Sequence, residues 1–244
     1  MMKRFLLIAI LALAPLGASS AAPKGDLPLG LEFSADPYDT DSIRRGAGLF
    51  VNYCMGCHSV ELLRWNRMAA DLGMEEEDVI ENMIFGDAEI HDPMISAMDP
   101  EDGEAWFGIE PPDLSLTGRS LGTDWIYAFL NTFYRDDMSA VGIDNLMLGG
   151  SSMPHVLSSL QGMPEAVRDD DGNIVDLEVP EHRQGVMSPE EYRQATADIA
   201  NFLAYAAEPI KAYRMQLGFK VILFLLLLTV LFYALKREYW KDVH

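Results

Sequence analysis

Both cysteines of this 244-residue chain stand in one five-residue segment, Cys54-Met55-Gly56-Cys57-His58. Two thiols three positions apart on a helical turn reach the two vinyl groups of one porphyrin, and the next residue places an imidazole under the iron, so this pattern is the attachment signature of c-type haem. The chain has only 2 Cys and 5 His, which makes a chance match rare. The segment predicts one covalently bound haem c, with Cys54 and Cys57 as thioether cysteines and His58 as an iron ligand.

Three other roles for the segment are weaker. A thioredoxin-like redox pair has the same cysteine spacing, but no strand–helix–strand pattern surrounds this one. A zinc site needs two further ligands, and His91, His155 and His182 are scattered along the chain. A disulfide closed within four residues is strained. The segment is therefore predicted to attach haem.

The N-terminus has the three parts of a secretory signal peptide. Two basic residues at positions 3 and 4 precede ten apolar residues (5–14) and a run of small residues that ends at Ala21-Ala22. Ten residues span about 15 Å as a helix, half of a hydrocarbon core of about 30 Å, which argues against an uncleaved anchor. We therefore predict a signal peptide over residues 1–21, and export to the compartment in which haem is attached.

A second apolar segment lies near the C-terminus. Leu217 to Leu235 is 19 residues long with one charge, Lys220, near its outer end, and at about 1.5 Å per residue it is long enough to cross a bilayer. A buried helix of a soluble core would show a polar face, and this segment has none beyond one threonine. We predict a transmembrane anchor over 214–236. Three basic residues flank it on each side, so the signal peptide sets the orientation: 22–213 exported, 237–244 a cytoplasmic tail.

The exported part carries most of the charge. Of the 38 acidic residues, 36 fall within 22–216, against 12 of the 18 basic residues, a net charge of −24. This balance argues against nucleic-acid binding, which needs the opposite sign. Dense acidic runs at 75–78, 99–104 and 169–171 are interpreted as solvated faces or turns. Together they favour encounter with a basic soluble partner at a salt-dependent rate.

Local patterns predict a mainly α fold with long loops and one small hairpin. Helices are expected over 42–53, 75–85 and 123–134, the last with Thr123 as its cap. Ser188-Pro189 followed by two glutamates is a strong helix start, and that helix runs until Pro209 interrupts it. A hairpin turn is expected at 169–173, between apolar pairs at 166–167 and 174–175. The rest of the exported part is predicted to be irregular.

The second axial ligand decides between an electron carrier and an open haem iron. Electron-transfer haems have both axial positions filled, commonly by histidine and methionine. The best candidate is Met153, in a small-residue loop, Gly149-Gly150-Ser151-Ser152-Met153-Pro154, about 95 residues after the haem motif. Met94, Met98, Met163 and Met187 remain alternatives by position alone, and His155 is a weaker competitor.

In order and spacing, several segments resemble the cytochrome c1 family, the haem subunit of the cytochrome bc1 (quinol–cytochrome c oxidoreductase) complex, in a shorter bacterial form. The similarity runs from about residue 40 to the C-terminus, and only the haem motif is specific by itself. The segments are 50–59 around the haem motif, Trp106-Phe107-Gly108, Pro111-Pro112-Asp113-Leu114-Ser115, Met153-Pro154, Ala206-Ala207-Glu208-Pro209, Met215-Gln216-Leu217-Gly218 and Lys236-Arg237.

This resemblance implies roles for particular residues. Met153 falls where the family places its axial methionine. Pro111 and Pro112 match the segment that packs along the haem on the histidine side, where a proline carbonyl accepts the imidazole N–H. Arg119 matches an arginine that pairs with a haem propionate, and Trp125 is expected at the haem edge or in the core. With no second cysteine pair, the extra disulfide of some relatives is absent.

The resemblance also implies a function and a setting. The expected fold is a cytochrome c-like haem domain in the periplasm, held on the bacterial inner membrane by one helix. Its haem would accept electrons from a Rieske iron–sulfur subunit and pass them to a soluble or anchored cytochrome c. The resemblance further implies a cytochrome b subunit as a partner and a dimeric complex. The alternatives are a stand-alone membrane-anchored c-type cytochrome, the haem subunit of another respiratory complex, and an open-coordination haem sensor or peroxidase.

Overall fold

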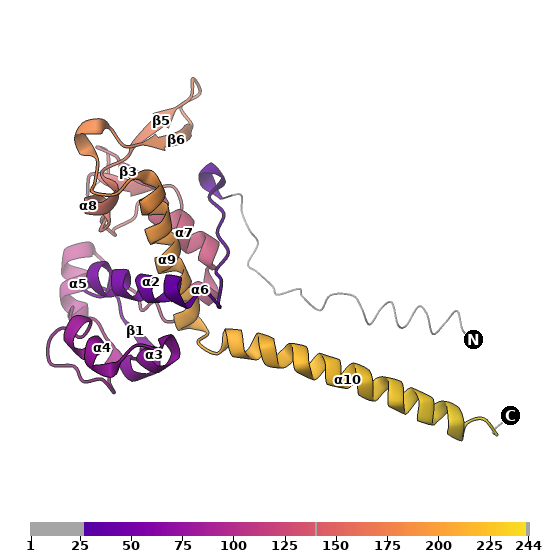
Figure 1. Cartoon of the computed structure of the whole chain (residues 1–244). Coiled ribbons are helices and arrows are strands. Elements are labelled where there is room, and N and C mark those ends of the chain that lie inside the picture. Colours follow the sequence, from indigo (N-terminus) through magenta and orange to yellow (C-terminus); the bar gives the residue numbers. More distant parts are fainter. Residues whose placement is uncertain (1–26, 140, 243–244) are drawn as a thin grey trace.

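Two helices that lie far apart in the sequence cross at the centre of the globular part, α2 (Thr40–Tyr53) and α9 (Pro189–Ala207). The computed structural model describes residues 27–139 and 141–242 (Figure 1), so the predicted signal peptide, residues 1–21, lies outside the described residues. The crossing is close because position 46 is glycine: a Cβ there would lie 2.0 Å from the Asp198 carbonyl oxygen. Beside it, the rings of Phe50 and Phe202 pack with centroids 5.3 Å apart.

The remaining elements surround this helix pair as short helices and two-stranded sheets. In chain order they are η1 (Pro28–Gly30), β1 (Val60–Arg64), α3 (Trp65–Leu72), α4 (Glu76–Asn82), β2 (Pro93–Met94), α5 (Pro100–Phe107), α6 (Thr117–Ser120), α7 (Thr123–Asn131), β3 (Phe133–Arg135), β4 (Ile143–Asn145), α8 (Ser158–Gln161), β5 (Glu165–Arg168), β6 (Ile174–Glu178) and η2 (Glu181–Arg183), with α10 (Lys211–Tyr239) following α9. The pairs β1–β2, β3–β4 and β5–β6 are each antiparallel.

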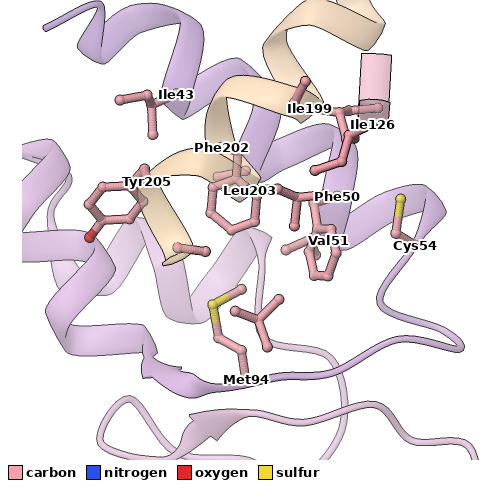
Figure 2. Close-up of a cluster of buried hydrophobic side chains, with 14 of the residues drawn as sticks. Ile43, Phe50, Val51, Cys54, Met94, Ile126, Ile199, Phe202, Leu203 and Tyr205 are labelled. Carbon is pink, nitrogen blue, oxygen red and sulfur yellow. The ribbon is translucent and has the colours of Figure 1, made fainter. Parts of the chain in front are cut away.

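The hydrophobic core lies between α2, α9, α7 and the first sheet. Figure 2 shows Phe50, Val51, Phe202 and Leu203 meeting at its centre, with Cys54 at the end of α2 on the edge of the cluster. Burial of this apolar surface is the main force holding the two helices together, at about 25 cal/mol for each Å² removed from water. The core therefore fixes the position of the chain where the haem motif begins.

Most of the predicted helices are confirmed. The segment expected at 42–53 is α2, and the one expected at 75–85 is the shorter α4. The Ser188 start of α9 is a full capping box: the Glu191 N–H donates to Ser188 Oγ, and the Ser188 N–H donates to Glu191 Oε2 at 2.8 Å. As expected, the helix ends just before Pro209. The overall class, mainly helical with small sheets and one C-terminal apolar helix, is as predicted.

Helix α7 differs from its prediction at both ends. Thr123 is not the cap; it is the first helical residue, and Gly122, with φ of 96°, precedes it. The helix stops at Asn131 rather than 134, because Thr132 Oγ1 donates to the Ala128 carbonyl and the chain continues into β3. A side chain such as Thr that bonds the preceding turn competes with helix continuation. β3 pairs with β4, which begins 10 residues after β3 begins. The local sequence pattern around 132–134 does not indicate this pairing.

The other predictions concern the hairpin and the acidic runs. The hairpin is confirmed as β5–β6, and its turn is held by Asp169, whose Oδ1 accepts from the Asn173 N–H at 2.8 Å. The acidic run 99–104 is not a plain loop: Asp99 caps α5, and Pro100 is its first residue. Two stretches predicted to be irregular, 60–74 and 86–94, contain regular structure: β1 and α3 lie in the first, and β2 lies in the second.

Helix α10 leaves the globular part and projects away from it (Figure 1). None of its described residues is buried, and it is the one helix of the described chain that is long and apolar enough to cross a membrane. Only residues 208–210 separate it from α9. Near this junction Arg214 forms an ion pair with Glu208, and Tyr38 Oη donates to the Ala212 carbonyl at 3.5 Å.

Candidate haem-binding site

The Cys-x-x-Cys-His segment follows α2 as a tight turn. The N–H groups of Cys57 and His58 both donate to the Cys54 carbonyl, at 3.0 and 2.9 Å. Cys54 is buried against the core, Cys57 is half-buried, and Gly56 between them is exposed with open space around it. The turn therefore carries the chain from the core to a surface cleft within five residues, with His58 at its far end.

The state of the two thiols separates the possible roles of this segment. Burial raises the pKa of Cys54 to about 12, and it also raises the pKa of Cys57. Reactive redox cysteines have lowered pKa values, and zinc binds thiolates. No disulfide joins the two cysteines, and the described residues contain no cluster of three or more His, Cys, Asp or Glu side chains that could hold a metal ion. The protein environment thus disfavours the thiolate forms that the redox and zinc alternatives need.

The cleft next to this turn joins residues from three distant parts of the chain. Its cavity volume is about 90 Å³, so the residues that line it, and not its size, indicate a bound ligand. Six of the eight predicted site residues line it: Cys54, Cys57, His58, Pro111, Pro112 and Met153. It is completed by apolar and small residues that were not predicted as site residues, namely Tyr53, Phe107, Ile109, Ser152, Pro154 and Val156.

His58 is oriented by the segment that begins at Pro111. Its Nδ1 donates to the Pro112 carbonyl oxygen at 2.8 Å, which leaves Nε2 as the nitrogen available to a metal. That segment is itself tied to the chain after the motif: the Leu114 N–H donates to the Ser59 carbonyl, and the Glu61 N–H to Asp113 Oδ2. Burial lowers the pKa of His58, with the Pro112 hydrogen bond opposing the shift, so the neutral imidazole that binds metals is favoured.

The position of each methionine narrows the choice of second ligand. Met153 lines the cleft together with His58, and its N–H donates to Ser151 Oγ at 3.2 Å. Met94 is fully buried in the core cluster drawn in Figure 2, and it pairs with Val60 across β1–β2. Met98, Met163 and Met187 do not line the cleft either.

His155, the weaker competitor, lies inside the protein rather than in the cleft. It is 5% exposed and its ring stacks on Phe133, with centroids 5.1 Å apart. Burial lowers the pKa of His155 to about 4, so this ring is neutral at physiological pH.

Arg119 and Trp125 are the two predicted residues that the structure does not bring to the cleft lining. Arg119 is exposed in α6, and its guanidinium forms no ion pair within the described residues. Trp125 is half-buried in α7 and stacks on Phe129, with ring centroids 5.0 Å apart and planes 9° from parallel. Their proposed contacts with a haem stay predictions.

The donor set of the cleft fits a c-type haem. Two thiols provide thioether bonds, an oriented imidazole and a thioether sulfur are the common pair of axial ligands, and prolines, Phe107 and Ile109 provide the apolar surface that a porphyrin needs. Sequence reasoning missed Phe107 and Ile109 as lining residues. Their signal was present, since they are apolar residues between an acidic helix and a Pro-Pro pair, but it required knowing that α5 packs beside the cleft.

Comparison with known proteins gives the family. The family model of the cytochrome C1 family matches residues 31–243. The chain belongs to the cytochrome c1 family. It is 41% identical to cytochrome c1 of Allochromatium vinosum, with both chains covered completely. It is also 41% identical to a Nitrosomonas europaea protein named ammonia monooxygenase gamma subunit, over the whole chain and 99% of that protein. Mitochondrial cytochrome c1 of Schizosaccharomyces pombe is 28% identical, over 84% of this chain and 68% of that protein.

Membership defines the cofactor and the setting in outline. A cytochrome c1 carries one covalently bound c-type haem, and both attachment cysteines are present here. It is the membrane-anchored haem subunit of the cytochrome bc1 complex, an electron-transport complex, and α10 fits the single anchor.

Proposed function

We propose that this cytochrome c1 relays single electrons from a Rieske iron–sulfur subunit to a soluble or anchored cytochrome c. The supporting observation is that one cleft contains both the Cys-x-x-Cys-His turn and Met153. The bound haem supplies an iron that gains and loses one electron. If His58 and Met153 both hold the iron, it would have no open site for a substrate, and the chain would transfer electrons without making or breaking substrate bonds.

The residues of the cleft divide this work among them. Cys54 and Cys57 hold the cofactor covalently at the end of a core helix. His58 would hold the iron, and its hydrogen bond to the Pro112 carbonyl fixes the plane of the imidazole and increases its basicity. Met153 would hold the iron from the loop, and a methionine ligand would raise the reduction potential relative to a second histidine. We extend the proposal to two outer residues, Arg119 as a propionate partner and Trp125 as a haem-edge aromatic.

The proposal also covers partners and orientation. The chain would assemble with cytochrome b and the Rieske subunit in a dimeric complex of the bacterial inner membrane, with residues 22–213 in the periplasm and the C-terminus in the cytoplasm. The signal peptide predicted from the sequence of residues 1–21 and the apolar helix α10 support this orientation. Acidic residues of α5, next to the cleft, support a basic acceptor.

Substitution of Met153 tests the ligand assignment. In Met153→Leu, the reduced haem should bind carbon monoxide and show a high-spin spectrum, and the reduction potential should fall, because one axial position is open. Met163→Leu is the matched control: it removes a half-buried methionine that does not line the cleft, and carbon monoxide binding and potential should remain as in the parent. A Met153→Leu protein with the spectrum and potential of the parent would show that another residue holds the iron.

Salt dependence tests the acceptor. Electron transfer to a basic cytochrome c should slow as ionic strength rises, since screening removes the attraction of the acidic surface. Stopped-flow rates that do not fall with added salt would remove the electrostatic part of the proposal.

Purification from membranes tests the assembly. An affinity tag on this chain should recover a cytochrome b and an iron–sulfur protein. Because one relative is named as a subunit of an ammonia monooxygenase, the second candidate is a haem subunit of another complex. Recovery of a different set of subunits, without cytochrome b, would favour that candidate.

A further inference from the structure

The loop that carries Met153, residues 147–154, has no long-range hydrogen bonds among the described residues. It lies between β4 and α8, and within the described chain the hydrogen bonds of residues 147–154 reach no further than six positions along the sequence. The longest is from the Gly150 N–H to Asp144 Oδ1, at 2.7 Å. Gly149 and Gly150 have open space around them, and Gly150 has φ of 74°. Hydrogen bonds within the loop therefore do not attach it to α2, α7 or α9.

His155, two residues after Met153, attaches this loop to the core. Its ring stacks on Phe133 of β3 at a centroid distance of 5.1 Å, with planes 14° from parallel. It also meets the ring of Tyr192, in α9, edge to face at 6.5 Å. Tyr192 is in turn fixed, because its hydroxyl donates to the Leu130 carbonyl at 2.7 Å. Through one side chain the loop thus contacts the strand that follows α7 and the first turn of α9.

The stacked pair of His155 and Phe133 belongs to a longer series of aromatic contacts. Phe133 meets Phe129 edge to face, and Phe129 stacks on Trp125, both at centroid distances of 5.0 Å. Such offset and edge-to-face arrangements have a definite geometry, unlike the contact of an aliphatic side chain. A ring at position 155 is therefore held in one orientation by neighbours that belong to regular elements.

The imidazole of His155 also has polar neighbours. The Gln161 side chain and the Gly162 backbone lie beside it and oppose the lowering of its pKa by burial. Its Nε2 is nevertheless buried and has no hydrogen-bond partner within the described residues, which lowers stability. The contacts of His155 with β3 and α9 are therefore made by the flat ring, through Phe133 and Tyr192.

We propose that His155 is a positioning residue that holds the Met153 sulfur in the haem cleft. Only Pro154 separates the two residues, and its ring fixes φ, so a shift of His155 passes directly to Met153. Without the ring contact, the loop would sample positions in which Met153 is withdrawn from the iron. This inference rests on the proposed ligation by Met153.

The test compares His155→Leu with His155→Phe in the holoprotein within its complex. Leucine fills the volume without a planar ring, and phenylalanine keeps the ring without the nitrogens. In His155→Leu we expect a weaker near-infrared charge-transfer band of the methionine-ligated ferric haem. We also expect a rise of about tenfold in carbon monoxide binding to the reduced haem, the size that loss of a ring contact implies. His155→Phe should restore both properties to the parent values.

Phe33→Leu is the matched control. It removes another aromatic stack on α7, with Tyr127 at 5.3 Å, but one outside the Met153 loop. Both haem properties should stay unchanged in this variant, even if its melting temperature falls.

Two results would overturn the inference. One is a folded His155→Leu protein with the band and carbon monoxide binding of the parent. The other is a His155→Phe protein altered as much as His155→Leu, which would mean that the imidazole itself matters. If Met153→Leu fails to open the iron, the ligand assignment is wrong and this inference falls with it. If Met153→Leu lets carbon monoxide bind the reduced haem but His155→Leu leaves carbon monoxide binding and the near-infrared band unchanged, only the positioning role of His155 is wrong.

Discussion

The two sides of the cleft are built in different ways. On the His58 side, Cys54, Cys57 and His58 follow the core helix α2. The segment of Pro111 and Pro112 is tied to the chain after the motif, by the Leu114 N–H to the Ser59 carbonyl and by Asp113 Oδ2, which accepts from the Glu61 N–H in β1. The Met153 side, comprising Ser152, Met153, Pro154 and Val156, belongs to a loop whose hydrogen bonds are local. One side is thus positioned by helix packing, and the other by packing of loop side chains against the core, among them the ring of His155. Changes in the helices should therefore alter stability, and changes in the loop should alter ligation.

The largest effect is expected at the helix crossing that supports the His58 side. In Gly46→Ala, the new Cβ would lie 2.0 Å from the Asp198 carbonyl oxygen, and backbone must move to admit it. The unfolding free energy should fall by about 3 kcal/mol, the upper part of the range for overpacking. Chemical denaturation of the holoprotein, followed by circular dichroism, measures this change.

Gly48 provides the matched control on the same helix, because nothing lies within 4 Å of a Cβ there. Gly48→Ala should raise stability by up to about 1 kcal/mol through helix propensity. Equal effects of the two substitutions would mean that the crossing does not depend on close approach at Gly46.

A smaller effect is expected where α5 meets the Pro111 segment. In Gly103→Ala, the Cβ would lie 2.6 Å from Pro111 Cδ, so the segment must shift and the His58–Pro112 hydrogen bond should lengthen. We expect a loss of about 1–3 kcal/mol and a changed reduction potential, whereas carbon monoxide should remain excluded. Potentiometric titration measures the change. Ala105→Gly, at an exposed position of the same helix, should weaken the helix by about 1 kcal/mol and leave the potential as it was.

Substitutions that affect the loop on the Met153 side should change methionine ligation more than they change stability. Asp144→Ala removes the acceptor of the Gly150 N–H, at a cost of about 1 kcal/mol of stability. The near-infrared band of the ligated methionine should weaken by more than this small loss of stability would suggest. Asp176→Ala is the control, since it removes a similar bond, to the Leu177 N–H, in the hairpin. If both substitutions leave the band unchanged, the loop is more rigid than its hydrogen bonds indicate.

The smallest effect is expected at the start of α9. Ser188→Ala removes the cap and should cost about 1 kcal/mol at neutral pH, with no change in potential or carbon monoxide binding. A changed potential at unchanged stability would contradict the division between the two sides.

The contribution of the Ser188–Glu191 capping box to stability should also depend on pH. The hydrogen bond from the Ser188 N–H lowers the pKa of Glu191 below its ordinary value of 4.5. Its contribution is therefore present above pH 4.5 and disappears as the pH falls through the lowered value. Thermal melts of the parent across this range should show the loss.

The sequence was most informative where the structure depends on local chemistry. The cap at Ser188, the hairpin around Asp169 and the turn from Cys54 to His58 all involve neighbours within a few residues, and all three were predicted. The start of α5 has the same kind of local signal, because Asp99 is followed by Pro100. The many acidic residues of this segment favour its interpretation as a solvent-exposed face or turn instead. That helix could have been predicted.

What could not be predicted depends on distant contacts. Nothing local indicates that Thr132 bonds Asn145 Oδ1, at 3.2 Å, where α7 ends and β3 begins. By position alone five methionines competed for one role, and folding separates them by burying Met94 in the core and placing Met153 in the cleft. The structure leaves Arg119 and Trp125 away from the cleft lining, so their roles still rest on the family resemblance.

The junction between α9 and α10 limits how far this haem can travel. Three residues, 208–210, join the two helices, and even fully extended they reach only about 10 Å. The Arg214–Glu208 ion pair and the contact from Tyr38 shorten that reach further. A domain joined to its anchor by so short a linker stays at a nearly constant distance from the membrane surface. Any redox protein that exchanges electrons with it must therefore move to the domain.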